Sequence, residues 1–252
     1  MLASPTRRQL ADWARLTQKK FRSESGLFLI EGEVCVREAI RSRVKLEALL
    51  ILTAEMERWE ALAEEAGRAP AYTVNAEPFR RISSVEASQG IAAVGRQFDL
   101  EPRRTDFGLA CEQVSDPGNC GALIRVADFF GASELILGPG SADRWNEKVV
   151  RGSMGSLFRQ PVRIANDFAA EAREWRGDTV ALVAHGGKPL GAVDKLNHPL
   201  LVLGHESRGL SVKIEKTCSH RVTLKPDGGA ESLNLVAAAA VFAFALGSNA
   251  HE

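Results

Sequence analysis

Hydrophobic positions in the first third of the chain fall into short apolar runs separated by stretches of helical periodicity. Apolar residues recur every three to four positions, which predicts helices over residues 7–20, 34–43, 54–66 and 77–82. Compact apolar runs predict strands over residues 26–32, 46–52, 72–74 and 91–94. We therefore expect a small α/β domain over residues 1–96.

A second region follows residues 97–105, which contain one proline and four charged residues and have the character of a linker. Apolar runs again alternate with helical stretches, and the predicted strands cover residues 107–114, 134–137, 179–184, 200–203 and 221–224. This alternation predicts a mostly parallel, layered sheet. The last predicted helix, residues 231–246, is apolar nearly all round, so it must be buried on several sides, and subunit contact is one way to bury it.

Composition narrows the class of protein. Hydrophobic residues make up 45% and charged residues 25% of the 252 residues, as in ordinary soluble globular proteins. No run of about 18 apolar residues predicts a membrane span, and the N-terminus lacks the apolar core of a signal peptide. Cys35, Cys111, Cys120 and Cys218 lie far apart without a CxxC pair. We therefore expect free thiols, no metal site and a cytoplasmic protein.

The distribution of charge leaves two readings open. The net charge is zero, which argues against a broad electrostatic nucleic-acid binder. Residues 1–50, however, contain ten Lys and Arg residues against six acidic residues. A solvated helical face is the simpler explanation of this excess, and a face that contacts RNA phosphates is the alternative.

Three segments of the second region place glycines and polar residues directly after apolar runs. They are residues 114–125 (VSDPGNCGALIR), 203–211 (LGHESRGLS) and 231–235 (ESLNL). Loops at the carboxyl ends of buried strands are where open α/β sheets bind ligands. Asn119 fits a helix cap, whereas Arg125 lies among apolar residues and needs either a partner or an open site. Asn234 is a poor residue for a helix interior.

Two common catalytic motifs are absent from the second segment. Its serine does not stand in a Gly-x-Ser-x-Gly sequence, and its histidine lacks the second histidine of HExxH. Residues 183–187 (VAHGG) end a predicted strand with small residues, and they read equally well as a plain turn or as a ligand-facing loop. A hydrolase is therefore a remote third possibility.

In order and separation, the three segments resemble motifs 1, 2 and 3 of the SpoU family of RNA ribose methyltransferases, part of the knotted SPOUT superfamily. The resemblance implies a parallel-sheet SPOUT domain with a trefoil knot over residues 106–252. It also implies S-adenosylmethionine as cofactor, methyl transfer to a ribose 2′-hydroxyl without a metal, and a homodimer.

The same resemblance implies roles for individual residues. The implied catalytic residues are Asn119, Arg125, Glu206, Ser232 and Asn234. The implied cofactor-binding residues are Ala184, His185, Gly186, Gly204, Glu206, Gly209, Leu224 and Leu233. The chain departs from the usual family form at His205, Ser207 and Val236.

The first region is similar to the substrate-binding domain that precedes many SpoU catalytic domains. The similarity rests on residues 19–22 (KKFR), 28–32 (FLIEG) and 36–39 (VREA), and it implies RNA contacts at Arg22 and Glu31. Residues 150–158 (VRGSMGSLF) resemble a further family segment, in which Arg151 either binds RNA or closes an ion pair.

Together the resemblances predict a 2′-O-methyltransferase that acts on RNA. Ribosomal RNA is favoured over transfer RNA because the first region is similar to that of ribosomal RNA enzymes. The alternative is a catalytically silent RNA-binding protein on the same fold, which the altered second segment and Val236 would favour.

Overall fold

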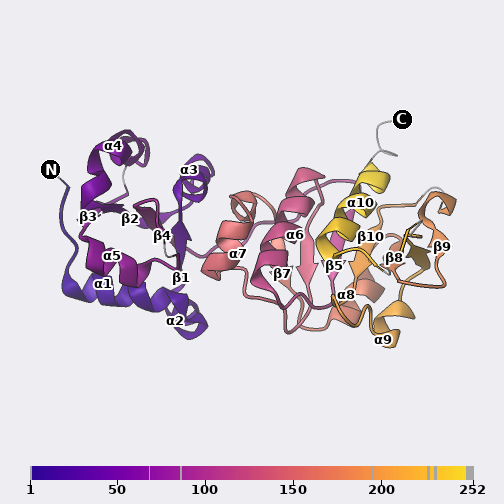
Figure 1. Ribbon diagram of the computed structural model, residues 1–252. Helices are drawn as coiled ribbons and strands as arrows, with labels where there is room; N and C mark the ends of the chain where they lie inside the picture. Colours follow the sequence, from indigo (N-terminus) through magenta and orange to yellow (C-terminus); the bar gives the residue numbers. More distant parts are fainter. Residues whose placement is uncertain are drawn as a thin grey trace. The chain divides into compact units, whose positions relative to one another are not determined.

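The computed structural model describes residues 2–67, 69–85, 87–193, 196–225, 228–229 and 232–247. The chain forms two compact units, each with its own sheet (Figure 1). The first unit combines residues up to 98 with residues 143–159, and the second combines residues 99–142 with those from 160 onward. The sequence analysis placed residues 143–159 in the second region, within the predicted limits 1–96, 97–105 and 106–252, whereas here they belong to the first unit. No helix in the described part of the chain is both long and apolar enough to cross a membrane.

A four-stranded sheet of order β1-β4-β2-β3 forms the centre of the first unit. Its strands are β1 (Leu27–Glu31), β2 (Leu46–Leu52), β3 (Ala71–Val74) and β4 (Ile91–Arg96). Strands β1 and β2 run antiparallel to β4, whereas β3 runs parallel to β2. The short apolar runs of the sequence therefore correspond to the strands of this unit.

Short helices cover this sheet. They are α1 (Arg7–Ala14), η1 (Arg15–Thr17), α2 (Lys19–Ser25), α3 (Glu33–Arg41), η2 (Thr53–Glu55), α4 (Met56–Glu65) and α5 (Ala76–Ile82). A capping box between Thr6 and Gln9 starts α1. The single helix predicted over residues 7–20 is divided, because Gln18 adopts an extended backbone conformation.

Residues 143–159 pack into the first unit through α7 (Glu147–Gly152) and η3 (Ser156–Phe158). Helix α7 lies against β1. The ring centroid of Phe28 lies 4.5 Å from that of Trp145 and 6.3 Å from that of Phe158. Since these aromatic side chains are buried, the segment completes the core of the first unit.

The second unit contains a seven-stranded sheet of order β7-β6-β5-β10-β8-β11-β9. Every strand pair in it is parallel, which confirms the predicted sheet type. The strands are β5 (Gly108–Cys111), β6 (Leu135–Leu137), β7 (Val162–Ile164), β8 (Thr179–Leu182), β9 (Lys188–Pro189), β10 (Leu200–Leu203) and β11 (His220–Thr223). Strands β7 and β9 were not predicted, because these short strands contain charged residues and are partly exposed, so they show no apolar run.

Helices cover both faces of this sheet. They are α6 (Pro117–Phe129), α8 (Phe168–Glu174), η4 (Leu190–Ala192), α9 (Val212–Glu215) and α10 (Leu235–Gly247). Phe168 of α8 and Ile214 of α9 pack on the face that presents Ala110 and Val202. Helices α6 and α10 pack side by side and lie in front of the strands in Figure 1. The predicted trefoil knot stays a prediction.

Helix α10 starts later than predicted. Its first residue is Leu235 rather than Glu231, and Glu231 lies outside the described residues. The side-chain oxygen of Asn234 accepts a hydrogen bond of 2.8 Å from the N–H of Val236, and its C=O accepts one of 2.9 Å from Ala238. Asn234 is therefore the N-cap of the helix, which explains an asparagine at this position.

Candidate functional site

Two central strands of the parallel sheet define the position of the site. From β5 the chain continues to β6 and β7 on one side, whereas β10, β8 and β11 lie on the other side. The loop after β5 leads into α6, and the loop after β10 leads into α9. The order of the strands therefore reverses between β5 and β10, and ligands bind at the carboxyl ends of the strands at such a point.

The first two predicted motifs meet at this point. The carboxylate of Asp116 caps α6 by accepting a hydrogen bond of 2.8 Å from the N–H of Asn119. The side-chain amide of Asn119 donates a hydrogen bond to the carboxylate of Glu206, in the loop after β10. Segments 87 residues apart in the sequence are thus joined by two of the predicted catalytic side chains.

The loop after β10 folds back on itself. His205 and Gly209 exchange backbone hydrogen bonds of 3.0 and 2.9 Å. A Cβ atom on Gly204 would lie 2.1 Å from the carbonyl carbon of Gly209, and Gly209 has a φ of +65°. Both glycines are therefore needed for the shape of the loop. At its tip, the N–H of Ser207 donates to Nδ1 of His205 at 3.2 Å, so the two departures from the family form contact each other.

Arg125 lies on α6 with an exposed side chain. It makes no hydrogen bond or ion pair with any described residue, unlike most arginines of this unit. The sequence left a partner or an open site as the alternatives for this residue, and the structure places its guanidinium at an open surface. A guanidinium group that makes no hydrogen bond or ion pair within the described chain is available to a ligand.

Other predicted cofactor residues follow β8, which pairs with β10, and β11, which pairs with β8. Ala184, His185 and Gly186 form an exposed turn after β8. Leu224 directly follows β11, and the hydroxyl of Thr223 accepts a hydrogen bond of 3.0 Å from the N–H of Gly187. The loop after β8 therefore contacts the last residue of β11 at the carboxyl edge.

Ser232 and Leu233 precede α10 and are exposed. Leu233 is 54% exposed, which is high for a large apolar residue. Asn234 has a structural role as the helix cap, which leaves both amide hydrogens and one lone pair of its side-chain oxygen available to a ligand. The roles predicted for these three residues stay predictions.

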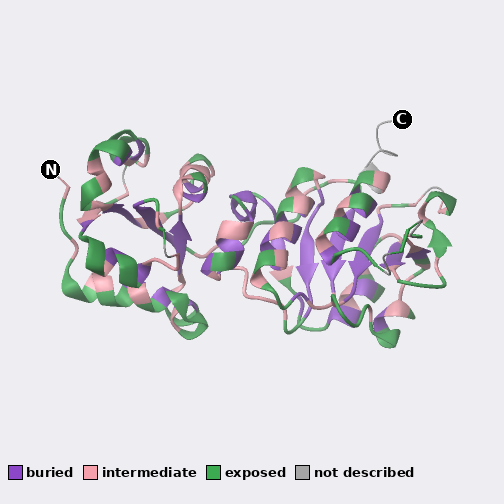
Figure 2. Cartoon of the chain, viewed as in Figure 1, coloured by how far each residue is buried: buried purple, intermediate pink, exposed green. Residues whose placement is uncertain are grey.

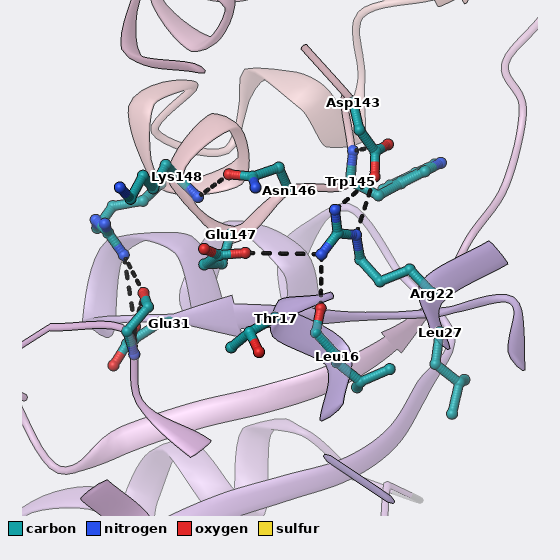
Figure 3. Close-up of polar contacts among 12 residues, drawn as sticks. Leu16, Thr17, Arg22, Leu27, Glu31, Asp143, Trp145, Asn146, Glu147 and Lys148 are labelled. Atoms are coloured by element: carbon teal, nitrogen blue, oxygen red, sulfur yellow. Dashed lines mark hydrogen bonds and ion pairs between the residues drawn. The ribbon is translucent and has the colours of Figure 1, made fainter. Parts of the chain in front are cut away.

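The RNA contacts predicted at Arg22 and Glu31 do not agree with the structure. Arg22 is 2% exposed, and its guanidinium donates hydrogen bonds of 2.7 and 3.0 Å to Asp143 and one of 2.7 Å to the C=O of Leu16. Glu147 lies 3.8 Å from the same guanidinium. Figure 3 shows the Arg22 side chain among these three partners. A buried, fully engaged arginine presents no charge to a phosphate.

Glu31 is 3% exposed and has a structural role as well. Its carboxylate accepts hydrogen bonds from the hydroxyl of Ser83 and from the N–H and hydroxyl of Ser84. Arg151 closes an ion pair of 3.5 Å with Glu31 and also donates to the Ser84 hydroxyl at 2.9 Å. The structure therefore shows the ion pair that was one of the two alternatives for Arg151. The Arg151 side chain remains 34% exposed.

Two buried cysteines, Cys35 and Cys111, are poor candidates for a nucleophile. Burial raises the pKa of Cys111 to about 12 and that of Cys35 to about 11. The Cys111 thiol donates to the C=O of Gly204 at 3.6 Å, directly beneath the loop after β10. Among the described residues, no group of three or more His, Cys, Asp and Glu side chains is placed to hold a metal ion. The polar groups at the site are therefore amides, carboxylates and arginines.

The sequence profile of the SpoU rRNA Methylase family matches residues 106–244, more than half of the chain. The chain belongs to the SpoU rRNA methylase family. The profile of the MRM3-like substrate binding domain matches residues 8–93. Both resemblances predicted from the motifs are confirmed.

Two methyltransferases named for 23S rRNA resemble this chain, one over nearly its full length and the other over about half of it. The 23S rRNA (guanosine(2553)-2′-O)-methyltransferase RlmP of Bacillus subtilis (strain 168) is 28% identical over 248 residues, which cover 97% of this chain and 98% of that protein. The 23S rRNA (uridine(2479)-2′-O)-methyltransferase of Streptomyces viridochromogenes is 37% identical over 151 residues, 56% of this chain and 53% of that protein.

The fold also matches a solved structure of the family along its full length. The SpoU methyltransferase AviRb from Streptomyces viridochromogenes, in complex with AdoMet, superposes with a TM-score of 0.86. The two chains are 27% identical, and the match covers 98% of this chain and 99% of AviRb. The predicted α/β SPOUT architecture with an N-terminal domain is therefore confirmed.

Proposed function

We propose that this protein transfers a methyl group from S-adenosylmethionine to a ribose 2′-hydroxyl of ribosomal RNA. The observation that carries the proposal is the Asn119–Glu206 hydrogen bond, which joins the first two SpoU motifs, together with the exposed guanidinium of Arg125 on the same helix as Asn119. The names of the RlmP and Streptomyces relatives support ribosomal RNA as substrate. We further propose a cytoplasmic location, as expected for an enzyme that meets ribosomal RNA.

The loops after β8, β10 and β11 fit an adenosyl cofactor. Gly186 and Gly209 adopt positive φ angles of +74° and +65°, and neither places a side chain between its loop and a cofactor. Leu224 and the exposed Leu233 offer apolar surface to a flat base. AdoMet in the related AviRb structure supports this assignment. When bound, the cofactor supplies an electrophilic methyl group on sulfur.

The chain supplies position and charge for the reaction. Arg125 is permanently charged and a poor base at neutral pH, so we assign it to hold a phosphate and to stabilise the negative charge that develops on the ribose oxygen. Asn119 and Glu206 fix the loop after β10 against the start of α6. Holding the hydroxyl in line with the methyl group is expected to provide much of the rate.

Two measurements test the proposed function. Calorimetric titration of the full chain with S-adenosylmethionine should give one site per chain, whereas the catalytically silent alternative predicts no binding. Mapping of 2′-O-methyl positions in 23S rRNA and transfer RNA from a deletion strain should then show one ribosomal position lost. A lost transfer RNA position with intact ribosomal RNA would contradict the substrate that we propose.

We also propose a homodimer formed through α6 and α10. Phe129 on α6 is 81% exposed, and Val241 and Phe244 on α10 are 44% and 65% exposed. Residues three and four apart share a helix face, so Val241 and Phe244 form one apolar stripe and Arg125 lies beside Phe129. Figure 2 shows exposed surface on both helices. A second copy would cover these side chains symmetrically and place Arg125 near the subunit boundary.

Light scattering at low micromolar concentration should therefore give twice the chain mass of 27.3 kDa. The substitution Phe244→Glu should raise the dimer dissociation constant at least about tenfold, because it places a charge in the apolar contact. Val212→Glu is the matched control, since Val212 is also 65% exposed but lies on α9. A stable monomer of the unsubstituted chain would contradict the dimer.

A further inference from the structure

A pocket of about 630 Å³ opens at the carboxyl edge of the second sheet. Residues that follow β5, β6 and β7 line one side of it, and residues 208–211 with the start of α9 line the other. Its volume is in the range of small-molecule sites. Among the described residues that line this pocket, Gly209 alone was predicted to bind the cofactor. Since the other cofactor loops follow β8 and β11, the pocket lies on the opposite side of the β10 loop from them.

Two cationic side chains reach the pocket. Lys213 of α9 is exposed and makes no hydrogen bond or ion pair with any described residue. Arg208 donates one hydrogen bond of 3.0 Å to the side chain of Gln113, which leaves its other N–H groups available. Together these side chains suit a phosphate group.

Two carboxylates lie in the same pocket, each with one oxygen already engaged. Glu112 accepts a hydrogen bond of 2.7 Å from the N–H of Ser211. Asp167 accepts hydrogen bonds of 3.0 and 3.1 Å from the N–H groups of Ala169 and Ala170. The second oxygen of each carboxylate can accept a hydrogen bond from a hydroxyl group.

The wall also contains a histidine ring and apolar surface. Because Nδ1 of His205 accepts a hydrogen bond from Ser207, the neutral ring carries its proton on Nε2 and can donate from there. Pro139, Leu210 and Ile214 supply apolar surface. Two positive and two negative side chains balance in charge, so the pocket suits neither a simple anion nor a simple cation. A ligand with a phosphate, hydroxyl groups and a flat base fits it better.

We propose that this pocket binds one nucleotide of the RNA substrate, with Lys213 and Arg208 at its phosphate and Glu112 and Asp167 at its hydroxyl groups. The pocket lies beside α8 and α9, whereas Arg125 lies on α6. The bound nucleotide is therefore a neighbour of the methylated one and contributes to the selection of the RNA. This inference rests on the proposed function for the source of the nucleotide.

The substitution Lys213→Ala tests the pocket, with Lys216→Ala as its matched control. Both lysines are exposed on or next to α9, but Lys216 does not line the pocket. With unmodified 23S rRNA, Lys213→Ala should raise Kd and KM roughly three- to tenfold and lower the slope of log affinity against log salt by about 1. The value of kcat and the affinity for S-adenosylmethionine should stay unchanged. Equal behaviour of the two variants, or a loss of cofactor affinity in Lys213→Ala, would overturn the proposal.

A free nucleotide separates the pocket from the methylation reaction. Saturation-transfer NMR of 5′-uridine monophosphate, with S-adenosylhomocysteine filling the cofactor site, should show binding to the unsubstituted chain and to Lys216→Ala but not to Lys213→Ala. Uridine and inorganic phosphate should each bind more weakly than the nucleotide. If the nucleotide bound but Lys213→Ala left the Kd for ribosomal RNA unchanged, the pocket would be a site for a free nucleotide. That result would overturn the RNA assignment. Because this readout needs no turnover, it is independent of a failure of the proposed methyl transfer.

Discussion

We expect Arg125→Ala to lower the rate of methyl transfer to ribosomal RNA by roughly 10²–10³-fold, as for the loss of one group that stabilises charge in a transition state. The affinity for S-adenosylmethionine should change little, because the predicted cofactor residues lie after β8, β10 and β11 rather than on α6. The stability of the chain should also stay within about 0.5 kcal/mol, since the side chain is exposed and has no partner among the described residues. Single-turnover kinetics and calorimetry measure these three quantities separately.

Two controls make the Arg125 result specific. Arg125→Lys keeps the positive charge but loses the planar fork, so an intermediate rate would assign part of the effect to geometry. Arg176→Ala removes another exposed arginine that has no hydrogen bond or ion pair with a described residue, and it should leave the rate unchanged. Near-normal turnover of Arg125→Ala would remove this residue from the proposed mechanism.

The largest expected effect on stability is that of Arg22→Ala. Removal of the guanidinium leaves the carboxylates of Asp143 and Glu147 close together, 17% and 9% exposed, without their cation. One oxygen of Glu147 already has no hydrogen-bond partner among the described residues. Breaking a buried ion pair from one side costs about 3–5 kcal/mol. We therefore expect a loss of this size in the unfolding free energy of the first unit, measured by chemical denaturation.

Lys20→Ala is the matched control for Arg22→Ala. Lys20 lies on the same helix, α2, and its ion pair with Glu24 is 3.9 Å long and exposed at the surface. Surface pairs of this kind contribute about 0–1 kcal/mol, so the control should unfold almost like the unsubstituted chain. If Arg22→Ala were no less stable than Lys20→Ala, the ion pairs of Arg22 with Asp143 and Glu147 would not stabilise the packing of residues 143–159 in the first unit.

The cluster of Arg22, Asp143 and Glu147 also affects how the substrate-binding and catalytic regions can be tested apart. A fragment of residues 1–96 would contain Arg22 and Glu31 without Asp143 and Arg151. A fragment of residues 106–252 would contain residues 143–159 without their partners. Because each fragment exposes buried charge, the full chain with point substitutions is the sounder material for testing which unit binds RNA.

The sequence alone was sufficient for the family, for the strands of the first unit and for five of the seven strands of the second. Apolar runs such as residues 46–52 and 200–203 predict strands directly, because a buried strand needs several consecutive apolar side chains. The three motifs were recognisable because loops at the carboxyl ends of strands need glycines and particular polar residues at fixed positions. These requirements are local, so neighbouring residues in the sequence are enough to reveal them.

Only the tertiary structure decided which charged residues are available to a ligand. Arg22 and Arg125 are both arginines in helical segments near apolar residues, yet Arg22 is buried against Asp143 and Arg125 is exposed. Arg22 is buried because its partner Asp143, 121 residues away in the sequence, lies next to it in the fold. Arg125 has no such partner among the described residues. The same holds for Asn119 and Glu206, for the pocket between the β5 and β10 loops, and for the place of residues 143–159 in the first unit. Hydrogen bonds and burial depend on distance in space, and a linear pattern records only distance along the chain.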